Sequence, residues 1–301
     1  MPPVCYSYKV YGFQVLSERP VREFEPLVER KEAEIFIRWQ DLDVQPVYEA
    51  KDWHFEIGAC DATLCFKGVG VFHIQNASTI VVRVEHGADE RMVERYLSGV
   101  VFAALLHLRG MVVYHASSVA INDREAIVFI GESGAGKSTL SALMHLRGFS
   151  CITDDVSPVT INAHGIDIIP GLPRLKIDPD LALQYNIPAD KLSPVHSSEE
   201  QIYLSLSEDF RRSPLSLKAL VFLDVAPQMA LRKITAREAM MQTVCHTLPS
   251  RLLNMTGGRD HFLRCSAIAG SIPAYTLSRT DDLSWRERLA DMVVSEIVGG
   301  E

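Results

Sequence analysis

The sequence lacks closely spaced cysteines, long apolar runs and an excess of basic residues. None of its six cysteines forms a Cys-x-x-Cys pair, which excludes a zinc knuckle and a thioredoxin-type motif. The longest apolar stretch, around residues 100–106, is too short to span a bilayer. The N-terminus has no basic segment followed by an apolar run, so no signal peptide is expected. We therefore expect a cytoplasmic protein whose thiols are reduced and mostly buried.

The chain also has little positive charge to attract a polyanion. Charged residues make up 23% of it and the net charge is −8, which argues against a nucleic acid or an anionic membrane as the main partner. Apolar residues reach 47%, enough to build a buried core. We therefore expect a globular protein with no nucleic-acid or membrane partner, and we leave open whether it forms a homo-oligomer.

The pattern of apolar residues divides the 301 positions into three parts. Short alternating or β-branched runs, separated by Gly, Asn or Asp, predict a β-rich N-terminal domain over 1–87. Apolar residues at helical spacing predict a connecting helix over 88–110 that stops at Arg109-Gly110. Strand and helix patterns alternate in the remainder, so we expect an α/β domain over 111–301, with a mixed sheet flanked by helices.

A glycine-rich loop lies between a predicted strand, 126–130, and a predicted helix that begins at Lys137. Gly134 and Gly136 permit backbone angles and close approaches that a Cβ would block. Successive N–H groups of such a loop, together with the helix N-terminus, hold phosphates. Lys137 would reach the β- and γ-phosphates of ATP, and the Ser138 hydroxyl would bind Mg²⁺. The predicted nucleotide-binding residues are Gly131, Glu132, Ser133, Gly134, Ala135, Gly136, Lys137, Ser138 and Thr139.

This phosphate loop indicates ATP but does not name a reaction. The Leu-Ser-Gly-Gly-Gln signature of ABC-type ATPases is absent, and so is the Asn-Lys-x-Asp motif with which GTPases read their base. The reaction therefore has to be inferred from the residues that the fold brings to the loop.

Two aspartates and a histidine are the candidate catalytic residues beside the loop. Asp154 and Asp155 end the strand that follows the loop's helix, and in an α/β sheet that end lies beside the loop. Adjacent residues at a strand end point in different directions, so one carboxylate can face the metal and the other the phosphate acceptor. A turn or helix-capping pair is the alternative. His115 follows an apolar strand, where it is either a hydrogen-bonded core residue or a group that acts on the transferring phosphate.

Taken together, these residues resemble the HPr serine kinase/phosphorylase family. The similarity is closest to the short HPr-kinase-like proteins, some of which accompany lasso-peptide biosynthesis genes. It is specific over about 105–180 and diffuse elsewhere. The matching segments are Tyr114-His115-Ala116-Ser117-Ser118-Val119, Gly131 to Thr139, Ile152-Thr153-Asp154-Asp155 and Pro170-Gly171-Leu172-Pro173-Arg174-Leu175-Lys176.

The resemblance implies a P-loop kinase domain of the HPr kinase/PEP carboxykinase type and a set of roles. Asp154 would take the proton from a serine hydroxyl, and His115 would assist at the phosphate. Asp155 would be a metal or supporting carboxylate. The acceptor would be serine on a peptide or small protein, with a lasso precursor peptide as one candidate. The glycine-rich segment that full-length HPr kinases carry downstream is absent, so HPr itself is not the expected acceptor.

Further basic residues and two other functions are left open. Arg174 and Lys176 could contact phosphate or acceptor, or could be solvated. For Arg251, Arg259 and Arg264, a solvated surface role is favoured over closure of the site. The same scaffold could also be an ATP-dependent regulatory module without kinase activity, or a kinase for a small-molecule hydroxyl.

Overall fold

The computed structural model describes residues 5–27, 32–40, 52–195, 201–206, 209–247, 258–281 and 285–299. These residues form two compact units. The first holds the described residues up to Val113 together with 258–261, and the second holds Tyr114–Thr247 and those from Phe262 onward. Among the described residues, no helix is both long and apolar enough to cross a membrane.

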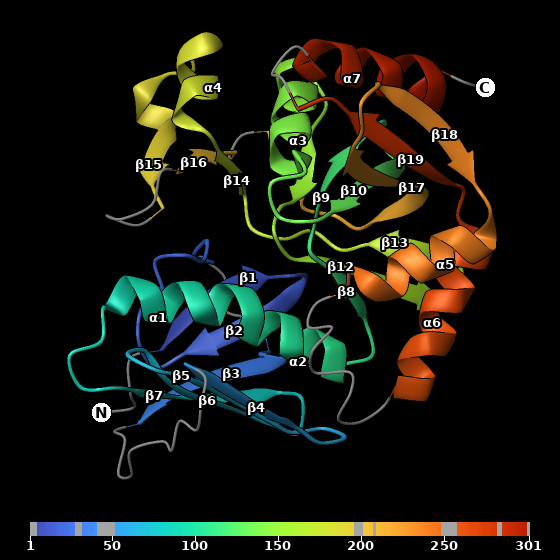
Figure 1. Ribbon diagram of the computed structural model, residues 1–301. Coiled ribbons are helices and arrows are strands. Elements are labelled where there is room, and N and C mark those ends of the chain that lie inside the picture. Colours follow the sequence, from blue (N-terminus) through green and yellow to red (C-terminus); the bar gives the residue numbers. More distant parts are fainter. Residues whose placement is uncertain are drawn as a thin grey trace. The chain divides into compact units, whose positions relative to one another are not determined.

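The first unit is built on a seven-stranded sheet in the order β1-β2-β3-β7-β6-β5-β4 (Figure 1). This agrees with the β-rich character expected for the N-terminal region. The β2–β3 and β3–β7 pairs are parallel, and the other pairs are antiparallel. The strands are β1 (Tyr6–Val10), β2 (Phe13–Ser17), β3 (Ile35–Gln40), β4 (Trp53–Ile57), β5 (Ala62–Phe66), β6 (Gly70–Gln75) and β7 (Thr79–Val84).

One helical segment covers a face of this sheet (Figure 1). It consists of α1 (Glu90–Tyr96), a π turn (Leu97–Val101) and α2 (Phe102–Leu108). The Asp89 side chain caps its start by accepting from the Arg91 N–H. Phe102 is fully buried and packs edge-on against Phe24, with ring centroids 5.4 Å apart.

The helix expected over 88–110 is therefore present, but it belongs to the first unit and does not stand alone as a connector. The reason is physical, because its apolar stripe needs the sheet to bury it. Tyr96 packs on Phe66, with ring centroids 4.2 Å apart, and the Tyr11 hydroxyl donates to the Ser98 carbonyl. The first unit also takes in 258–261, which the expected boundaries placed in the second domain.

The second unit is a mixed α/β structure whose main sheet has the order β11-β9-β10-β17-β13-β12. β19 lies beside β17, and β18 lies beside β19. β8 (Val112–Tyr114), where the chain passes between the units, follows β12 in this sheet. The strands are β9 (Ala116–Ala120), β10 (Glu125–Gly131), β11 (Cys151–Thr153), β12 (Ser157–Asn162), β13 (Gly165–Ile168), β17 (Leu215–Val225), β18 (Ala230–Ile234) and β19 (Ala274–Arg279).

Helices flank this sheet, and a small second sheet has the order β14-β16-β15. The helices are α3 (Lys137–Leu146), α4 (Pro179–Gln184), α5 (Ala236–Cys245), α6 (Gly258–Ser271) and α7 (Trp285–Val293), with a short 3₁₀ turn at Ala189–Lys191 and a π turn at Val294–Val298. The small strands are β14 (Arg174–Ile177), β15 (Leu192–Pro194) and β16 (Ile202–Ser205). Residues 126–130 of β10 are all fully buried, as expected of a central strand covered on both faces.

Strand directions decide where the candidate residues meet. β10, β17 and β19 are parallel, whereas β9 is antiparallel to both β10 and β11. The start of β9 therefore shares an edge of the sheet with the ends of β10, β11 and β19. His115, the phosphate loop, Asp154 and Arg279 all lie at that edge, just outside or at the end of these strands.

The packing of the helical segment in the first unit gives a stability prediction. Phe102→Ala should lower the free energy of unfolding by about 3–5 kcal/mol, because a fully buried aromatic ring is lost and a cavity remains. Phe36→Ala is the matched control, since its ring is 38% exposed on β3 of the same sheet. Urea unfolding followed by tryptophan fluorescence measures both. Equal losses in the two variants would contradict the described packing.

Candidate active site

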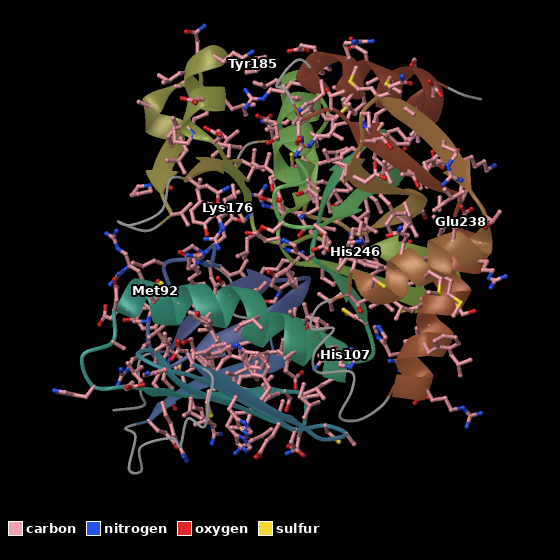
Figure 2. The ribbon with its side chains drawn as sticks, viewed as in Figure 1. Met92, His107, Lys176, Tyr185, Glu238 and His246 are labelled. Carbon is pink, nitrogen blue, oxygen red and sulfur yellow. The ribbon has the colours of Figure 1, made fainter. Side chains whose placement is uncertain are left out.

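A pocket of about 390 Å³ opens at the shared edge of the sheet. It has room for part or all of a small organic ligand. Lys176, on β14, is among the side chains that reach it (Figure 2). The described residues that line the pocket are His115, Ser133, Gly134, Gly136, Lys137, Ser138, Thr139, Asp155, Lys176, Asp178, Gln201, Arg279, Asp281, Trp285 and Arg286.

The glycine-rich loop has the backbone that phosphate binding needs. Gly134 and Gly136 have φ values of 79° and 102°, in the left-handed region that glycine tolerates best. Gly136 is the N-cap of α3 and has no side chain to bond the first N–H groups of the helix. Those groups, with the positive end of the helix dipole, are therefore free to bind an anion.

Two glycines of the loop are also required by close contacts. A Cβ on Gly131 would lie 2.7 Å from the Leu223 carbonyl oxygen of the neighbouring strand. A Cβ on Gly136 would lie 2.9 Å from Cη2 of Trp285. Both distances are too short for a side chain, so the loop can sit against β17 and α7 only because these positions are glycine.

Arg279, at the end of β19, holds the outer side of the loop. Its Nε donates to the Ala135 carbonyl and its Nη2 to the Gly134 carbonyl, each at 2.8 Å. Its guanidinium also lies 5.2 Å from the ring centroid of Trp285. These bonds fix the backbone of the loop between Gly134 and Gly136, both of which line the pocket.

The Lys137 ammonium is buried and bonded to the loop itself. Its Nζ donates to the Gly131 and Glu132 carbonyls, each at 2.9 Å. Burial lowers the pKa of Lys137, while the Asp155 and Asp154 carboxylates oppose that shift. A phosphate entering the loop would offer the ammonium a stronger, charged acceptor than two carbonyls.

Asp154 is held by three donors from three elements. Its Oδ1 accepts from the hydroxyls of Ser138, at 2.8 Å, and of Ser117. Its Oδ2 accepts from the Lys176 backbone N–H at 2.8 Å. Burial and the neighbouring Asp155 carboxylate raise the pKa of Asp154 to about 6, and the three hydrogen bonds act against that rise. This carboxylate lies behind the pocket and is not among the described residues that line it.

Asp155 instead faces the pocket. Its φ of 64° lies in the left-handed region, which costs least for Asn and Asp among residues with a side chain. This turn separates the two carboxylates, so that Asp154 points toward Ser138 and Asp155 toward the open space. The Lys176 ammonium lies 3.9 Å from Oδ2 of Asp155. The two adjacent carboxylates therefore point in different directions, as expected, because of the backbone conformation of Asp155.

His115 borders the pocket with one ring nitrogen engaged. Its Nδ1 lies 3.1 Å from the Asp155 carbonyl oxygen, and a carbonyl can only accept, so Nδ1 carries the proton. Burial and the Lys137 ammonium lower the pKa of His115, with Asp155 opposing them. The ring is therefore neutral at pH 7, and Nε2 is left as an acceptor.

The segment 170–176 reaches the site because of Gly171. A Cβ on this residue would lie 2.3 Å from Oγ1 of Thr153. The Gly171 N–H donates to the Ile152 carbonyl at 2.8 Å, which fixes the segment against the end of β11. This contact brings both the N–H and the ammonium of Lys176 to the carboxylate pair.

Not every predicted residue reaches the pocket. The Arg174 guanidinium lies 4.2 Å from the ring centroid of Tyr203, and Arg174 is not among the described lining residues. Neither are the side chains of Glu132 and Ala135, although the carbonyls of both residues accept the hydrogen bonds given above. Arg259 and Arg264 are also absent from that lining, and Arg251 lies outside the described residues.

Sequence reasoning missed several residues at the site. No motif predicts that Ser117 or Arg279 belongs to the site, although Tyr275 and Thr276, residue types enriched in strands, could have indicated β19. His246, at the end of α5, was also missed (Figure 2). Its carbonyl accepts from the His115 N–H at 3.3 Å, and its Nδ1 lies 3.8 Å from a Glu132 carboxylate oxygen.

The donor set at the loop fits a magnesium ion. The Ser138 hydroxyl gives its hydrogen to Asp154, so its lone pairs are free for a cation. Among the described residues, no three His, Cys, Asp or Glu side chains form a ready-made metal cage. Mg²⁺ typically binds through one or two carboxylates plus substrate phosphates and water, so it does not require such a cage.

The charges around His115 predict that two substitutions shift the pKa of this histidine in opposite directions. Lys137→Gln should raise the pKa of His115, because it removes a cation that disfavours the imidazolium. Asp155→Asn should lower that pKa further, because it removes a carboxylate that favours the imidazolium, while the Asn side chain tolerates the same backbone. NMR titration of the imidazole resonances measures both. Shifts of the same sign would contradict this environment.

No family model and no curated protein matches this sequence. Among solved structures, the fold is similar to that of the Hpr(Ser) kinase/phosphatase from Coxiella burnetii, with 10% sequence identity and a TM-score of 0.33. The match covers 61% of this chain and 88% of that chain. A likeness of this size carries no argument about chemistry, so the function has to be inferred from the site itself.

Proposed function

We propose that this chain is an ATP- and Mg²⁺-dependent kinase that transfers the γ-phosphoryl group to a hydroxyl. The observation that carries the proposal is the contact between the Ser138 hydroxyl and Asp154 at the start of α3. A hydroxyl at the end of a phosphate loop, bonded to a carboxylate at the end of a nearby strand, is how P-loop enzymes hold a metal-bound nucleotide. The motif alone does not require this contact.

The proposed nucleotide site places the phosphates on the loop. The N–H groups of the loop and of the start of α3 would hold the β-phosphate, and the Lys137 ammonium would leave its two carbonyl partners for the β- and γ-phosphates. Ser138 and Asp155 would bind Mg²⁺, with Asp154 supporting Ser138 from behind. When bound, the metal neutralises charge on the transferring phosphoryl group. Arg279 would keep the loop open for binding by holding its carbonyls outward.

The acceptor side needs a group that takes the hydroxyl proton. The resemblance assigns this role to Asp154, whose pKa of about 6 suits a base that works near neutral pH. Because Asp154 lies behind the pocket with both oxygens hydrogen-bonded, it would have to exchange one of these partners for the acceptor hydroxyl. Asp155, which faces the pocket, is the alternative base. His115 offers an unprotonated Nε2 in its neutral form, so it would act on the phosphate as a donor only after gaining a proton. Phosphate charge near the ring would favour that protonation.

Serine on a peptide or small protein is the acceptor that we favour, on the strength of the sequence resemblance. Precursor peptides of lasso-peptide pathways are therefore the first candidates to test. A small-molecule hydroxyl is the second class to test with the same assay. A regulatory module without kinase activity is disfavoured by the pair of carboxylates, because a module that only senses nucleotide needs no base on the acceptor side.

Substitution of the carboxylates tests the chemistry. Asp154→Asn should lower phosphoryl transfer by about 10²-fold or more, because general base catalysis and support of Ser138 are both lost. The affinity for ATP without metal should change little. Mass spectrometry of candidate peptides incubated with Mg²⁺ and ATP measures transfer, and isothermal titration calorimetry measures affinity.

Asp178→Asn is the control for that experiment, since Asp178 also lines the pocket but its carboxylate caps α4. If Asp154→Asn keeps full transfer and Asp155→Asn loses it, the base is Asp155. Full transfer in both variants would contradict a hydroxyl kinase at this site.

The raised pKa of Asp154 predicts that phosphoryl transfer slows in acid. The folded protein holds this carboxyl at a pKa of about 6, so it is ionised above that pH and protonated below it. Transfer should therefore fall tenfold for each unit of pH below about 6 if the ionised form is required. A pH–rate profile of kcat/KM measures this fall. A rate that stays level well below pH 6 would exclude ionised Asp154 from the reaction.

A further inference from the structure

Ser117 is a polar side chain in the interior of the sheet. It lies in the second position of β9, is fully buried, and pairs with Phe129 of β10. The neighbouring positions of β9 and β10 are mostly apolar. A hydroxyl in such a place costs free energy unless it finds a hydrogen-bond partner. Ser117 finds its partner at the site, where it donates to Oδ1 of Asp154.

The direction of this side chain follows from the period of the strand. Val119, two positions on, belongs to the core that also contains Leu140 and Leu143 of α3, so positions 117 and 119 face α3. Ser118 faces the other side of the sheet. It is fully buried as well, but its hydroxyl has no hydrogen-bond partner in the described structure. Of these two adjacent buried serines, Ser117 contacts Asp154 and Ser118 does not.

The two hydroxyls on Asp154 form one local network. Ser117 and Ser138 both donate to Oδ1, and their Oγ atoms lie 3.4 Å apart. Because Lys176 donates to Oδ2, the carboxylate cannot rotate without breaking contacts to β9, α3 and β14. A carboxylate fixed in this way also fixes the Ser138 hydroxyl, whose lone pairs then face away from Asp154.

We propose that Ser117 is a positioning residue for phosphoryl transfer, which holds the Asp154 carboxylate against the metal-binding hydroxyl of Ser138. Its role is indirect, because Ser117 does not line the pocket. It acts by keeping the Asp154 carboxylate pointed at Ser138, which in turn keeps the Ser138 lone pairs available to Mg²⁺. This inference rests on the proposed function.

The dependence of ATP affinity on Mg²⁺ gives the proposal a readout that packing alone would not move. Without the Ser117 hydroxyl, Asp154 loses one of the three donors that fix its carboxylate beside Ser138. The affinity for metal-bound ATP should therefore fall, and the affinity for ATP alone should not.

The experiment measures ATP affinity with and without Mg²⁺ at neutral pH by isothermal titration calorimetry. In the wild type, Mg²⁺ should strengthen ATP binding. In Ser117→Ala this strengthening should fall about tenfold. Ser117→Cys keeps the volume but offers a weak donor, so it should behave like Ser117→Ala.

Ser118→Ala is the matched control, since it removes a buried hydroxyl from the adjacent position without touching Asp154. Mg²⁺ should strengthen its ATP binding as much as it does in the wild type. If Ser117→Ala and Ser117→Cys give the same profile as Ser118→Ala, the positioning role is overturned and the proposed function stands. A wild type that binds ATP no better with Mg²⁺ than without it would overturn both.

Discussion

The Asp154 carboxylate is the constraint on which the site depends. Its two oxygens receive hydrogen bonds from β9, α3 and β14, three elements that come from different parts of the chain. A buried carboxylate needs such donors, because an unpaired charge in the interior is costly. The same need fixes the distance between the phosphate loop and the segment that carries Lys176. Stability and site geometry are therefore set by one group.

Much of the candidate site was predictable because its residues lie in short segments with recognisable spacing. The glycine positions, the following helix and the aspartates after the next strand have fixed spacing, and the strand directions bring them together. The helix over 88–110 was predictable for the same reason, since the helical spacing of apolar residues can be recognised within a short segment. Its placement in the first unit was not predictable, because spacing identifies an apolar face but not the surface that covers it.

The missed residues depend on contacts between distant segments. Arg279 matters because β19 lies two strands from β10, and no local pattern reports that order. Ser117 reads as a small polar residue after His115, and only its burial and its contact with Asp154 show that it belongs to β9 and to the site. The sequence leaves the role of Arg174 open between a phosphate contact and a solvated position, and the fold places its guanidinium over the ring of Tyr203.

The bonds from Arg279 to the phosphate loop join residues 144 and 145 positions apart. During synthesis the loop is made long before the strand that carries Arg279. A growing or truncated chain can therefore contain the whole glycine-rich motif and the helix after it, and still lack the two hydrogen bonds that hold the loop carbonyls. The backbone geometry of the loop is thus completed only when β19 has joined the sheet.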